Sequence, residues 1–387
     1  MEEKYFCKIG DKMKTMKTAI VGCGVISDVY IQSIQEKFSI LELCACSDLD
    51  VSRMRATHEK YGLRSMSYDE ILADPEIGMI LNLTSPVAHY SLSKQALEAG
   101  KHVYSEKMLT VELEEAEKLC KIAQEKGVRL GCAPDTFLGG GIQTARYAID
   151  RKLAGNLLSG VVSLTRDYRV FGENLPHLFK KGGSILYDMG CYYLTALCSI
   201  LGRVERIFAF GKKTEERHLV KRVDSTFFGQ ELPVDECNVV TALLWFENGV
   251  QVTVHLNSSS ILNETFHLEL YGDSGIIRMG DPNSFGGAVT LEKPKNEKVL
   301  LPFTHGFQEQ SRGLGAAEMA YSILAGRLHR ASMEQACHVL EIVHGVLTSI
   351  ETMKVYETKT NFERPQPLPE GYIGCGFWEP TEESALL

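Results

Sequence analysis

The sequence of 387 residues contains no run of about 18 consecutive apolar residues, the length that a helix needs to cross a membrane. It also contains no block of basic residues, because 41 lysines and arginines are mixed with 50 acidic residues and leave a net charge of -9. Nucleic acid and anionic membrane surfaces are therefore poor candidates as partners. No internal repeat and no low-complexity segment interrupts the chain.

The eleven cysteines are scattered and odd in number, and they form neither a pair of C-x-x-C motifs nor a cluster with histidines. Because zinc sites usually need such clusters, no metal site is predicted. Reduced thiols in a cytoplasmic protein are the simplest interpretation. Residues 1–16 are charged and lack the apolar core of a secretory signal, which favours a disordered extension or a leader.

The most informative stretch lies between residues 17 and 48. An apolar run at residues 18–21 leads into G-C-G-V-I-S at residues 22–27, and a second apolar run at residues 41–46 follows a helical pattern. This order predicts a strand, a glycine turn, a helix and a second strand. In such a unit one glycine permits the sharp turn, another lets the backbone approach a pyrophosphate, and the start of the helix binds the anion.

Asp48 would lie at the end of the second strand, where the ribose diol of a dinucleotide is held. A carboxylate there repels a 2′-phosphate and the next arginine is Arg53, so we expect NAD rather than NADP. A glycine turn in another kind of βαβ unit is the alternative, because the third glycine of the fingerprint is replaced by Ser27. The residues expected to bind the coenzyme through this unit are Gly22, Gly24, Val25, Ile26 and Asp48.

Strands and helices continue to alternate as far as residue 135. Helical patterns are found at residues 54–61, 91–99 and 113–126, and strand patterns at residues 77–83, 101–105 and 128–132. Short loops between them predict a doubly wound parallel sheet with its ligand crevice at the carboxyl ends of the strands. The polar residues that follow these strands are Asp48, Thr84, His89, Glu106, Lys107 and Asp135.

From about residue 136 the pattern becomes that of an α+β domain. Helices are predicted at residues 142–152, 185–201, 308–328 and 333–356, a strand at residues 160–168, and hairpins at residues 239–256 and 265–279. Together they indicate a large, mainly antiparallel open sheet of about six or more strands. If helices cover only one face of it, the other face must meet solvent or another subunit, so we expect a homodimer or homotetramer.

Several loose motifs occur in a fixed order along the chain. They are the fingerprint at residues 22–27, Thr84-Ser85-Pro86-Val87-Ala88-His89, Glu106-Lys107-Met108, Gly182-Gly183 with Asp188-Met189-Gly190-Cys191-Tyr192-Tyr193, Arg312-Gly313-Leu314-Gly315 and His329-Arg330-Ala331-Ser332. As a set they are specific. Over residues 17–355 the chain resembles the glucose–fructose oxidoreductase / inositol dehydrogenase (Gfo/Idh/MocA) family.

The resemblance implies NAD(P)-dependent oxidation or reduction of a sugar or cyclitol hydroxyl. It implies a Rossmann domain at residues 17–136 and a substrate and oligomerisation domain at residues 137–356, whose last helices can pack back on the first domain, before a tail at residues 357–387. The coenzyme site then also includes Thr84, Pro86, His89, Glu106 and Lys107. The implied catalytic residues are Lys107, Asp188 and Tyr192, and the implied substrate contacts are Lys107, Asp135, Thr136, Arg169, His177, Asp188 and Tyr192.

Two positions depart from the family pattern. Met108 replaces a proline, and Tyr192 stands where the family usually has the histidine that accepts the proton. A carbinol that loses hydride must also lose its hydroxyl proton to a base. Because Tyr192 replaces the usual histidine, the identity of this base is open between Lys107, Tyr192 and His177. Lys107 can stabilise an alkoxide, or accept the proton if burial lowers its pKa, and Tyr192 can relay a proton as a phenolate.

Three functions are compatible with these residues. The first is oxidation of a secondary ring hydroxyl of a sugar or glycoside, expected at carbon 3 of a pyranose. The second is a dehydrogenase of the same family that acts on a cyclitol or dihydrodiol, and the third is a non-catalytic NAD-binding regulator. Purely structural roles compete at several positions: Glu106 and Lys107 as a surface ion pair, Asp188 as a helix cap, Tyr192 as a core aromatic, His89 and Asp135 as loop residues, and His177 as a solvated side chain.

Overall fold

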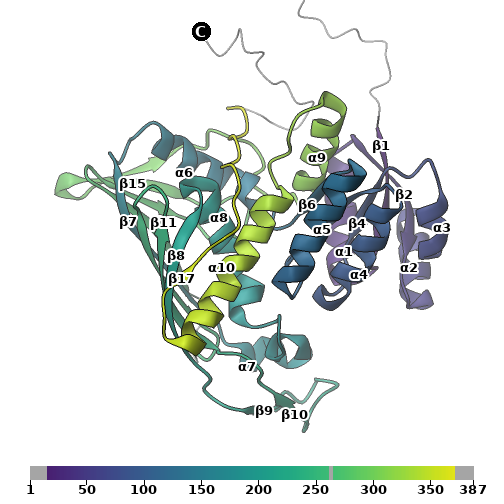
Figure 1. Cartoon of the computed structure of the whole chain (residues 1–387), viewed down its shortest axis with the longest axis horizontal. Coiled ribbons are helices and arrows are strands. Elements are labelled where there is room, and N and C mark those ends of the chain that lie inside the picture. The colour runs from purple at the N-terminus through teal and green to yellow at the C-terminus, as the bar shows by residue number, and fades with distance from the viewer. Residues whose placement is uncertain (1–14, 261–264, 371–387) are drawn as a thin grey trace, which may run out of the picture.

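Two sheets with a layer of helices between them form the frame of the protein, as the computed structural model shows for residues 15–260 and 265–370 (Figure 1). The predicted extension at residues 1–16 and the predicted tail at residues 357–387 therefore lie partly outside the described residues. The described part of the tail, residues 358–370, returns across the second half of the molecule, where Phe362 and Leu368 are buried.

The first sheet contains six parallel strands in the order β3-β2-β1-β4-β5-β6. The strands are β1 (Met16–Val21), β2 (Leu41–Ser47), β3 (Arg64–Ser65), β4 (Met79–Asn82), β5 (His102–Ser105) and β6 (Leu130–Cys132). Strands β2 and β3 lie on one side of β1, and strands β4, β5 and β6 lie on the other. This change of direction between β1 and β4 places a ligand crevice at the carboxyl ends of these two strands. The predicted doubly wound parallel sheet is confirmed.

The helices of this half are α1 (Val25–Lys37), α2 (Val51–Tyr61), α3 (Tyr68–Ala73), α4 (Pro86–Glu98) and α5 (Leu113–Lys126). The starts predicted for α2 and α4, at residues 54 and 91, were wrong by about one turn. Asp50 caps α2 by accepting hydrogen bonds from the amides of Ser52 and Arg53. Pro86 is the first residue of α4, a position where its missing N–H costs nothing.

In the described residues the second sheet has nine strands, in the order β16-β15-β14-β13-β7-β12-β11-β8-β17. Their bounds are β7 (Leu157–Thr165), β8 (Val204–Lys212), β11 (Val239–Phe246), β12 (Gln251–Asn257), β13 (Thr265–Gly272), β14 (Ile276–Met279), β15 (Val289–Lys293), β16 (Glu297–Leu301) and β17 (Tyr356–Glu357). Among the described strands of this second sheet only β7 and β12 pair in parallel, so the predicted, mainly antiparallel sheet is confirmed. A short hairpin of β9 (Arg217–Leu219) and β10 (Glu231–Pro233) extends from it (Figure 1).

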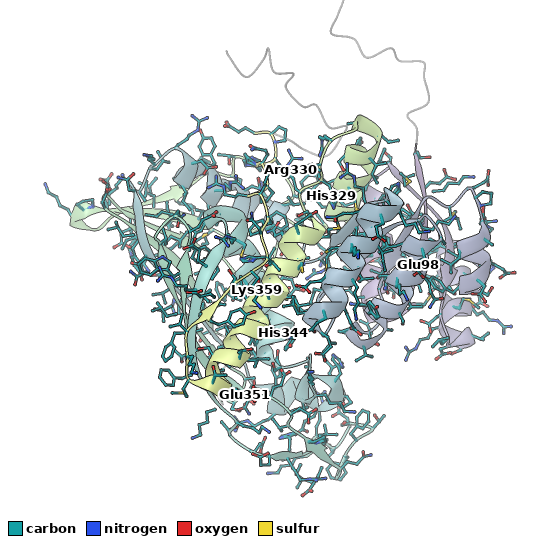
Figure 2. All side chains as sticks on the ribbon, in the orientation of Figure 1. Glu98, His329, Arg330, His344, Glu351 and Lys359 are labelled. Carbon is teal, nitrogen blue, oxygen red and sulfur yellow. The ribbon has the colours of Figure 1, made fainter. Side chains whose placement is uncertain are left out.

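The helices of the second half are α6 (Gly140–Asp150), α7 (Tyr168–Phe171), α8 (Cys191–Leu201), α9 (Leu314–Ala325) and α10 (Met333–Thr352). Every residue of α8 is buried. Helix α10 packs against β8 and α8 on one side and against α5 and β6 on the other. His344 of α10 lies 2.9 Å from the carbonyl oxygen of Val111, ahead of α5, and so ties the helix to the first half (Figure 2).

The described helices cover one face of the nine-stranded sheet and leave the other open (Figure 1). Along β11 the even-numbered residues Val240, Ala242 and Leu244 are buried, whereas Leu243 faces outward and is 42% exposed. Phe210 of the adjacent β8 is 55% exposed. Exposed apolar side chains that gather on a sheet face are typical of a protein interface.

We expect two or four copies of the chain to associate through this open face. The double substitution Leu243→Asp and Phe210→Asp should lower the molar mass found by light scattering at micromolar concentration, because each new charge would have to be buried. Leu324→Asp, at an equally exposed apolar residue of α9, is the matched control and should change nothing. A wild-type protein that is monomeric under these conditions would contradict the expectation.

Candidate active site

The turn between β1 and α1 has the geometry of a phosphate cradle. Gly22 has a φ of 97°, and a Cβ atom on it would lie 2.7 Å from the carbonyl carbon of Leu83. A Cβ atom on Gly24 would meet no atom of the described residues within 4 Å, so an anion can approach the backbone there. Because no side chain within the described ranges caps the start of α1, its first N–H groups can bind that anion. These features fit the pyrophosphate of a dinucleotide.

Asp48 lies beside this turn, at the end of β2. The backbone N–H of Cys23 donates to its Oδ2 atom at 2.6 Å, and the N–H of Asp50 donates to its Oδ1 atom at 2.8 Å. Each carboxylate oxygen has a second lone pair, so the side chain is oriented and can still accept hydrogen bonds from a ribose diol. Arg53 lies 3.4 Å from Asp50, its ion-pair partner.

Four exposed apolar side chains surround the crevice at the ends of β1, β2 and β4. Val25 is 92% exposed at the start of α1, Leu49 and Val51 precede and begin α2, and Val87 lies in the first turn of α4. Exposed apolar groups around a phosphate cradle suit the flat rings of a dinucleotide. The sequence analysis expected only Val25 to bind the coenzyme. Leu49 directly follows the strand-end residue Asp48, and Val51 and Val87 lie three residues after Asp48 and Thr84, so closeness to these polar residues was the available signal.

His89 holds the loops after β4 and β5 together. Its Nδ1 atom lies 2.7 Å from the carbonyl oxygen of Met108, and its Nε2 atom lies 3.0 Å from that of Thr84. Burial lowers the pKa of the ring, which is fully enclosed. The side chain thus positions these two loops, and its predicted contact with the coenzyme stays a prediction. The roles predicted for Thr84 and Pro86 stay predictions.

Asp135 and Thr136 also lie inside the protein, at 1% and 2% exposure, and their predicted contacts with substrate stay predictions. The Oδ2 atom of Asp135 accepts hydrogen bonds from the amides of Gly313 at 2.9 Å and Gly315 at 3.0 Å. These bonds fix the start of α9 against the end of the first sheet. Burial raises the pKa of Asp135 to about 6.

Three segments that are far apart in the sequence meet at Asp188. The Nζ atom of Lys107, in the loop after β5, donates to Asp188 Oδ1 at 2.7 Å and to the Asp188 carbonyl oxygen at 2.9 Å. The hydroxyl of Tyr168, at the start of α7, donates to Asp188 Oδ2 at 2.7 Å. Asp188 itself lies in a π-helical turn (Leu186–Gly190) that precedes α8. The predicted pair of Lys107 and Asp188 is thus brought together.

This ion pair stays charged around neutral pH. Burial lowers the pKa of Lys107, but the charge of Asp188 outweighs burial and holds the pKa well above its ordinary value. Burial raises the pKa of Asp188, but the charge and the hydrogen bond of Lys107 hold it below its ordinary value. Glu106, beside them, accepts hydrogen bonds from the Tyr30 hydroxyl and from the Lys107 amide.

Tyr192 contributes the face of its ring. The Nζ atom of Lys107 lies 5.3 Å from the ring centroid, a cation–π distance, whereas the hydroxyl lies 3.4 Å from an Nη atom of Arg312. Burial raises the pKa of Tyr192 to about 12. Burial therefore disfavours a phenolate that receives a proton, although the charges of Lys107 and Arg312 oppose it, and the catalytic role of Tyr192 stays a prediction.

Two further predicted residues, His177 and Arg169, lie in the segment that follows Tyr168. His177 lies in a short 3-10 helix (Pro176–Phe179), where it is exposed and feels the charges of both Asp188 and Lys107. Partial burial lowers its pKa, so the ring is neutral at pH 7. Arg169 forms a two-pronged ion pair with Asp167 at 2.8 and 2.9 Å. Their predicted contacts with substrate stay predictions.

The sequence analysis missed Tyr168 and Arg312 as members of the site. Along β7 the even-numbered residues from 160 to 164 point into the core, and the same alternation leads to Tyr168. Arg312 donates to Asn283 Oδ1 at 3.0 Å as well as to Tyr192. No spacing in the sequence links a loop before α9 to α8, so only the fold reveals this contact.

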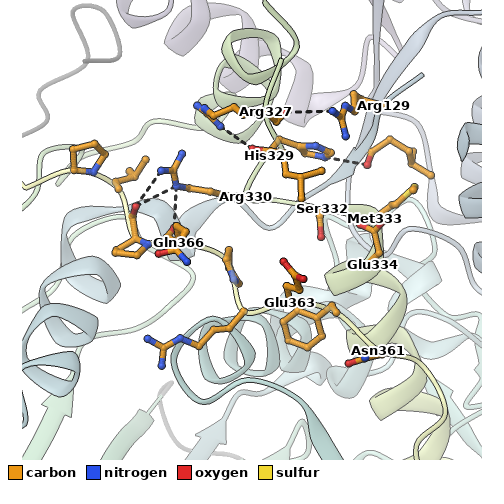
Figure 3. A pocket seen from close by; sticks show the side chains of 18 of the residues that line it. Arg129, Arg327, His329, Arg330, Ser332, Met333, Glu334, Asn361, Glu363 and Gln366 are labelled. Carbon is orange, nitrogen blue, oxygen red and sulfur yellow. Dashed lines mark hydrogen bonds between the residues drawn. The ribbon is translucent and has the colours of Figure 1, made fainter. Parts of the chain in front are cut away.

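A cavity of about 1460 Å³ lies away from this cluster, between the end of α5, the loop after α9 and residues 361–370. Arg330 crosses one side of it and donates to the carbonyl oxygens of Gln366 and Pro367 (Figure 3). None of Lys107, Asp188 and Tyr192 lines this cavity, so it is separate from the candidate active site. Within residues 15–260 and 265–370, no helix is long and apolar enough to cross a membrane, and no cluster of metal-binding side chains is found.

Comparison with models of known protein families shows to which family the chain belongs. A family model described as an oxidoreductase family with an NAD-binding Rossmann fold matches residues 16–133, and the model of the GFO/IDH/MocA C-terminal domain matches residues 142–278. The chain belongs to the Gfo/Idh/MocA family. The resemblance expected from the sequence motifs is confirmed, and so is the expectation of an oxidoreductase with an NAD-binding domain.

Relatives and solved structures extend this comparison. The D-xylose dehydrogenase of Paenarthrobacter nicotinovorans is 24% identical over 321 residues, which cover 75% of this chain and 80% of the relative. The D-apiose dehydrogenase of Paraburkholderia graminis is 24% identical over 274 residues, which cover 69% and 68%. A solved levoglucosan dehydrogenase in complex with NADH and L-sorbose has a TM-score of 0.77 at 17% identity, over 89% of this chain and 99% of that one. It shows a shared fold.

Asp48→Ala should reduce the preference for NAD over NADP. The variant removes a negative charge that would face and repel a 2′-phosphate. Loss of this repulsion should change the ratio of kcat/KM with NAD to kcat/KM with NADP by about tenfold or more. The ratio of kcat/KM with the two coenzymes measures it. Glu42→Ala, at an exposed acid on the same strand, should leave the ratio unchanged. A wild-type enzyme that prefers NADP would contradict the assignment of Asp48.

Asp188→Asn should lower the pKa of Lys107, because burial would then act on the ammonium without the opposing carboxylate. In the variant, Lys107 would lose its proton at a lower pH than in the wild type. The alkaline limb of the profile of kcat/KM against pH should therefore move to lower pH. Asp167→Asn removes a nearby acid that pairs with Arg169 and is the control. An alkaline limb that stays in place would show that Lys107 does not set it.

Proposed function

We propose that the protein is an NAD-dependent dehydrogenase that oxidises a secondary ring hydroxyl of a sugar or glycoside, at carbon 3 of a pyranose, to give a 3-keto sugar. The observation that carries the proposal is the charged pair of Lys107 and Asp188 at the carboxyl edge of the dinucleotide-binding sheet. Support for a sugar comes from relatives named as dehydrogenases of D-xylose and D-apiose and from the structural neighbour with L-sorbose.

The coenzyme would be held by the glycine turn, the uncapped start of α1 and Asp48. When bound, NAD supplies the acceptor for the hydride of the carbinol carbon. The chain itself must orient the substrate hydroxyl and manage its proton. Lys107 is placed for the first task, because it follows β5 at the crevice and its charge is maintained by Asp188.

The Lys107 ammonium would donate a hydrogen bond to the reacting oxygen and stabilise the negative charge that develops on it. Two of its hydrogen bonds go to Asp188, which fixes the direction of the third. Asp188 accepts hydrogen bonds from Lys107 and Tyr168 and maintains the charge of Lys107, so it is a positioning residue in this scheme. The ring of Tyr192 flanks the ammonium.

The proton of the hydroxyl needs a separate acceptor. An ammonium cannot take it, and Tyr192, with a pKa of about 12, is itself protonated at neutral pH. His177 is exposed, neutral and close enough to feel the charges of the pair, so we assign the proton to its ring. A neutral imidazole whose pKa lies near or below the working pH is an effective general base.

A substrate panel tests the proposal. The purified protein is mixed with NAD and with sugars, glycosides, cyclitols or dihydrodiols, and NADH formation is followed by its absorbance. Turnover with a pyranose and a ketone at carbon 3 of the product, located by NMR, is the expected result. Turnover with cyclitols alone would favour the second function, and bound NAD without turnover of any polyol would favour a regulator.

Single variants separate the roles of the site residues. Lys107→Met should lower kcat by roughly 100-fold or more while NAD binding persists, since both alkoxide stabilisation and orientation are lost. His177→Gln should also lower kcat and remove the acid limb of the pH profile, whereas Tyr192→Phe should be nearly silent. Lys181→Met, at an exposed lysine paired with Glu112, is the matched control. A large loss of kcat in Tyr192→Phe with full activity in His177→Gln would place the proton at Tyr192 instead.

A further inference from the structure

The ring of His177, to which we assign the substrate proton, is not held by hydrogen bonds of its own. Within the ranges that the structure describes, no hydrogen bond to this ring is found. The 3-10 helix that carries it, Pro176–Phe179, is a single turn, and a helix of that length is not stable by itself. Contacts between this helix and its neighbours therefore decide where the ring lies.

The backbone of the helix rests against the glycine pair of the following loop. A Cβ atom on Gly183 would lie 1.8 Å from the carbonyl oxygen of His177, so a larger residue would push the two segments apart. The N–H of Lys180 donates to the same carbonyl oxygen at 3.2 Å. The Gly182-Gly183 motif, for which the sequence analysis had no role, thus supports the backbone at His177.

The β9–β10 hairpin holds the end of the helix. The ring of Phe179, the last helical residue, stacks on the imidazole of His218 in β9, with the ring centroids 4.8 Å apart and the planes at 3°. The carbonyl oxygen of Phe179 accepts a hydrogen bond from the N–H of Asp235, which follows β10, at 2.9 Å. Both strands of the hairpin thus contribute to the contact.

A buried carboxylate fastens the same hairpin to the residues just before the helix. Glu173 lies in a second 3-10 turn, Gly172–Asn174, and its Oε1 atom is 2.9 Å from Nε2 of His218. Its Oε2 atom accepts hydrogen bonds from the amides of Lys221 at 3.0 Å and Arg222 at 2.5 Å. Burial raises the pKa of Glu173, but the bonds from His218 and the two amides hold it below its ordinary value.

His218 is therefore in contact with the chain on both sides of His177, at Glu173 and at Phe179. Its Nδ1 atom lies 2.9 Å from Glu215 Oε1, so contacts at both ring nitrogens fix the plane of the imidazole. Side chains alternate along a strand, and here the two neighbours of His218 in β9 are exposed whereas His218 is buried. Of the three residues of β9, the histidine is the one turned toward the helix.

We propose that Glu173 and His218 are positioning residues for the reaction, because through them the β9–β10 hairpin holds the His177 helix where the ring can accept the substrate proton. The inference rests on the proposed function, since it takes His177 as the base. Neither residue touches substrate in this scheme, and both act through the backbone of residues 173–179. Any movement of the helix must take the hairpin with it or break these contacts.

The size of the effect follows from the demands of proton transfer. A general base must lie within about 3 Å of the hydroxyl whose proton it accepts, and a displacement of about 1 Å can cost a factor of about 100 in rate. Loosening the hairpin contacts should therefore lower kcat. NAD binding should not change, because none of the contacts involves the glycine turn or Asp48.

Two variants of the full chain loosen these contacts. Glu173→Gln removes the charge, whereas His218→Phe keeps a ring for the stack on Phe179 and loses both nitrogens. Each should lower kcat by about tenfold while the Kd of NADH, measured by fluorescence titration, stays at the wild-type value. The double variant of His177→Gln and His218→Phe should have a kcat no lower than that of His177→Gln, because the hairpin acts through His177.

Hydrogen exchange followed by mass spectrometry supplies a readout that needs no substrate. Amides of residues 172–180 should exchange faster in His218→Phe and in Glu173→Gln, because local opening becomes easier. Arg217→Gln breaks an exposed ion pair with Glu231 inside the same hairpin and is the matched control, with wild-type kcat and wild-type exchange. If a thermal melt shows that His218→Phe is not folded, His218→Gln takes its place with the same expected results.

Several results would contradict the positioning role and leave the proposed function intact. One is unchanged exchange at residues 172–180 in both variants. Another is wild-type kcat in Glu173→Gln and His218→Phe when His177→Gln has lost activity. A double variant whose loss equals the product of the two single losses would show an effect independent of His177. Full activity of His177→Gln would instead overturn the assignment of the proton and this inference together.

Discussion

The ion pair of Lys107 and Asp188 is the constraint around which the site is arranged. A partly buried pair of charges is tolerated when its remaining hydrogen-bonding capacity is satisfied, and here Tyr168 and the Asp188 carbonyl oxygen do so. Removing either charge would leave the other without compensation. Lys107 comes from the first sheet and Asp188 from the second half, so the pair also fixes how the dinucleotide cradle faces the substrate region.

Local sequence signals predicted the parts of this arrangement that short segments define. The glycine turn, Asp48 at the end of β2 and Lys107 after β5 follow from the βαβ pattern, because sequence spacing sets their positions on a sheet edge. The pairing of Lys107 with Asp188 followed from family resemblance. Tyr168 and Arg312 were missed, since their partners lie at distant points of the chain and tertiary packing alone brings them together.

His89 and Asp135 have structural roles of the same kind. His89 and Asp135 follow strands of the first sheet, as ligand-binding residues do, and nothing in the sequence shows that neighbouring loops cover them. In the fold their polar atoms bond to backbone groups of the loop at Met108 and of the loop at Gly313. A polar residue at the end of a strand can thus bind either a ligand or the backbone of the loops that build the site. Burial of the side chain in the fold distinguishes the second role from the first.

Helix α10 has a consequence for motion. It packs against strands of both sheets, β8 and β6, so a hinge rotation of one half against the other would have to break one of these two interfaces. Opening by domain rotation is therefore disfavoured, and exchange of substrate falls to the shorter segments at the rim of the crevice, among them the 3-10 helix that carries His177. His177, to which we assign the substrate proton, would then lie in a segment that moves when substrate enters or leaves. Turnover would be coupled to the movement of that segment.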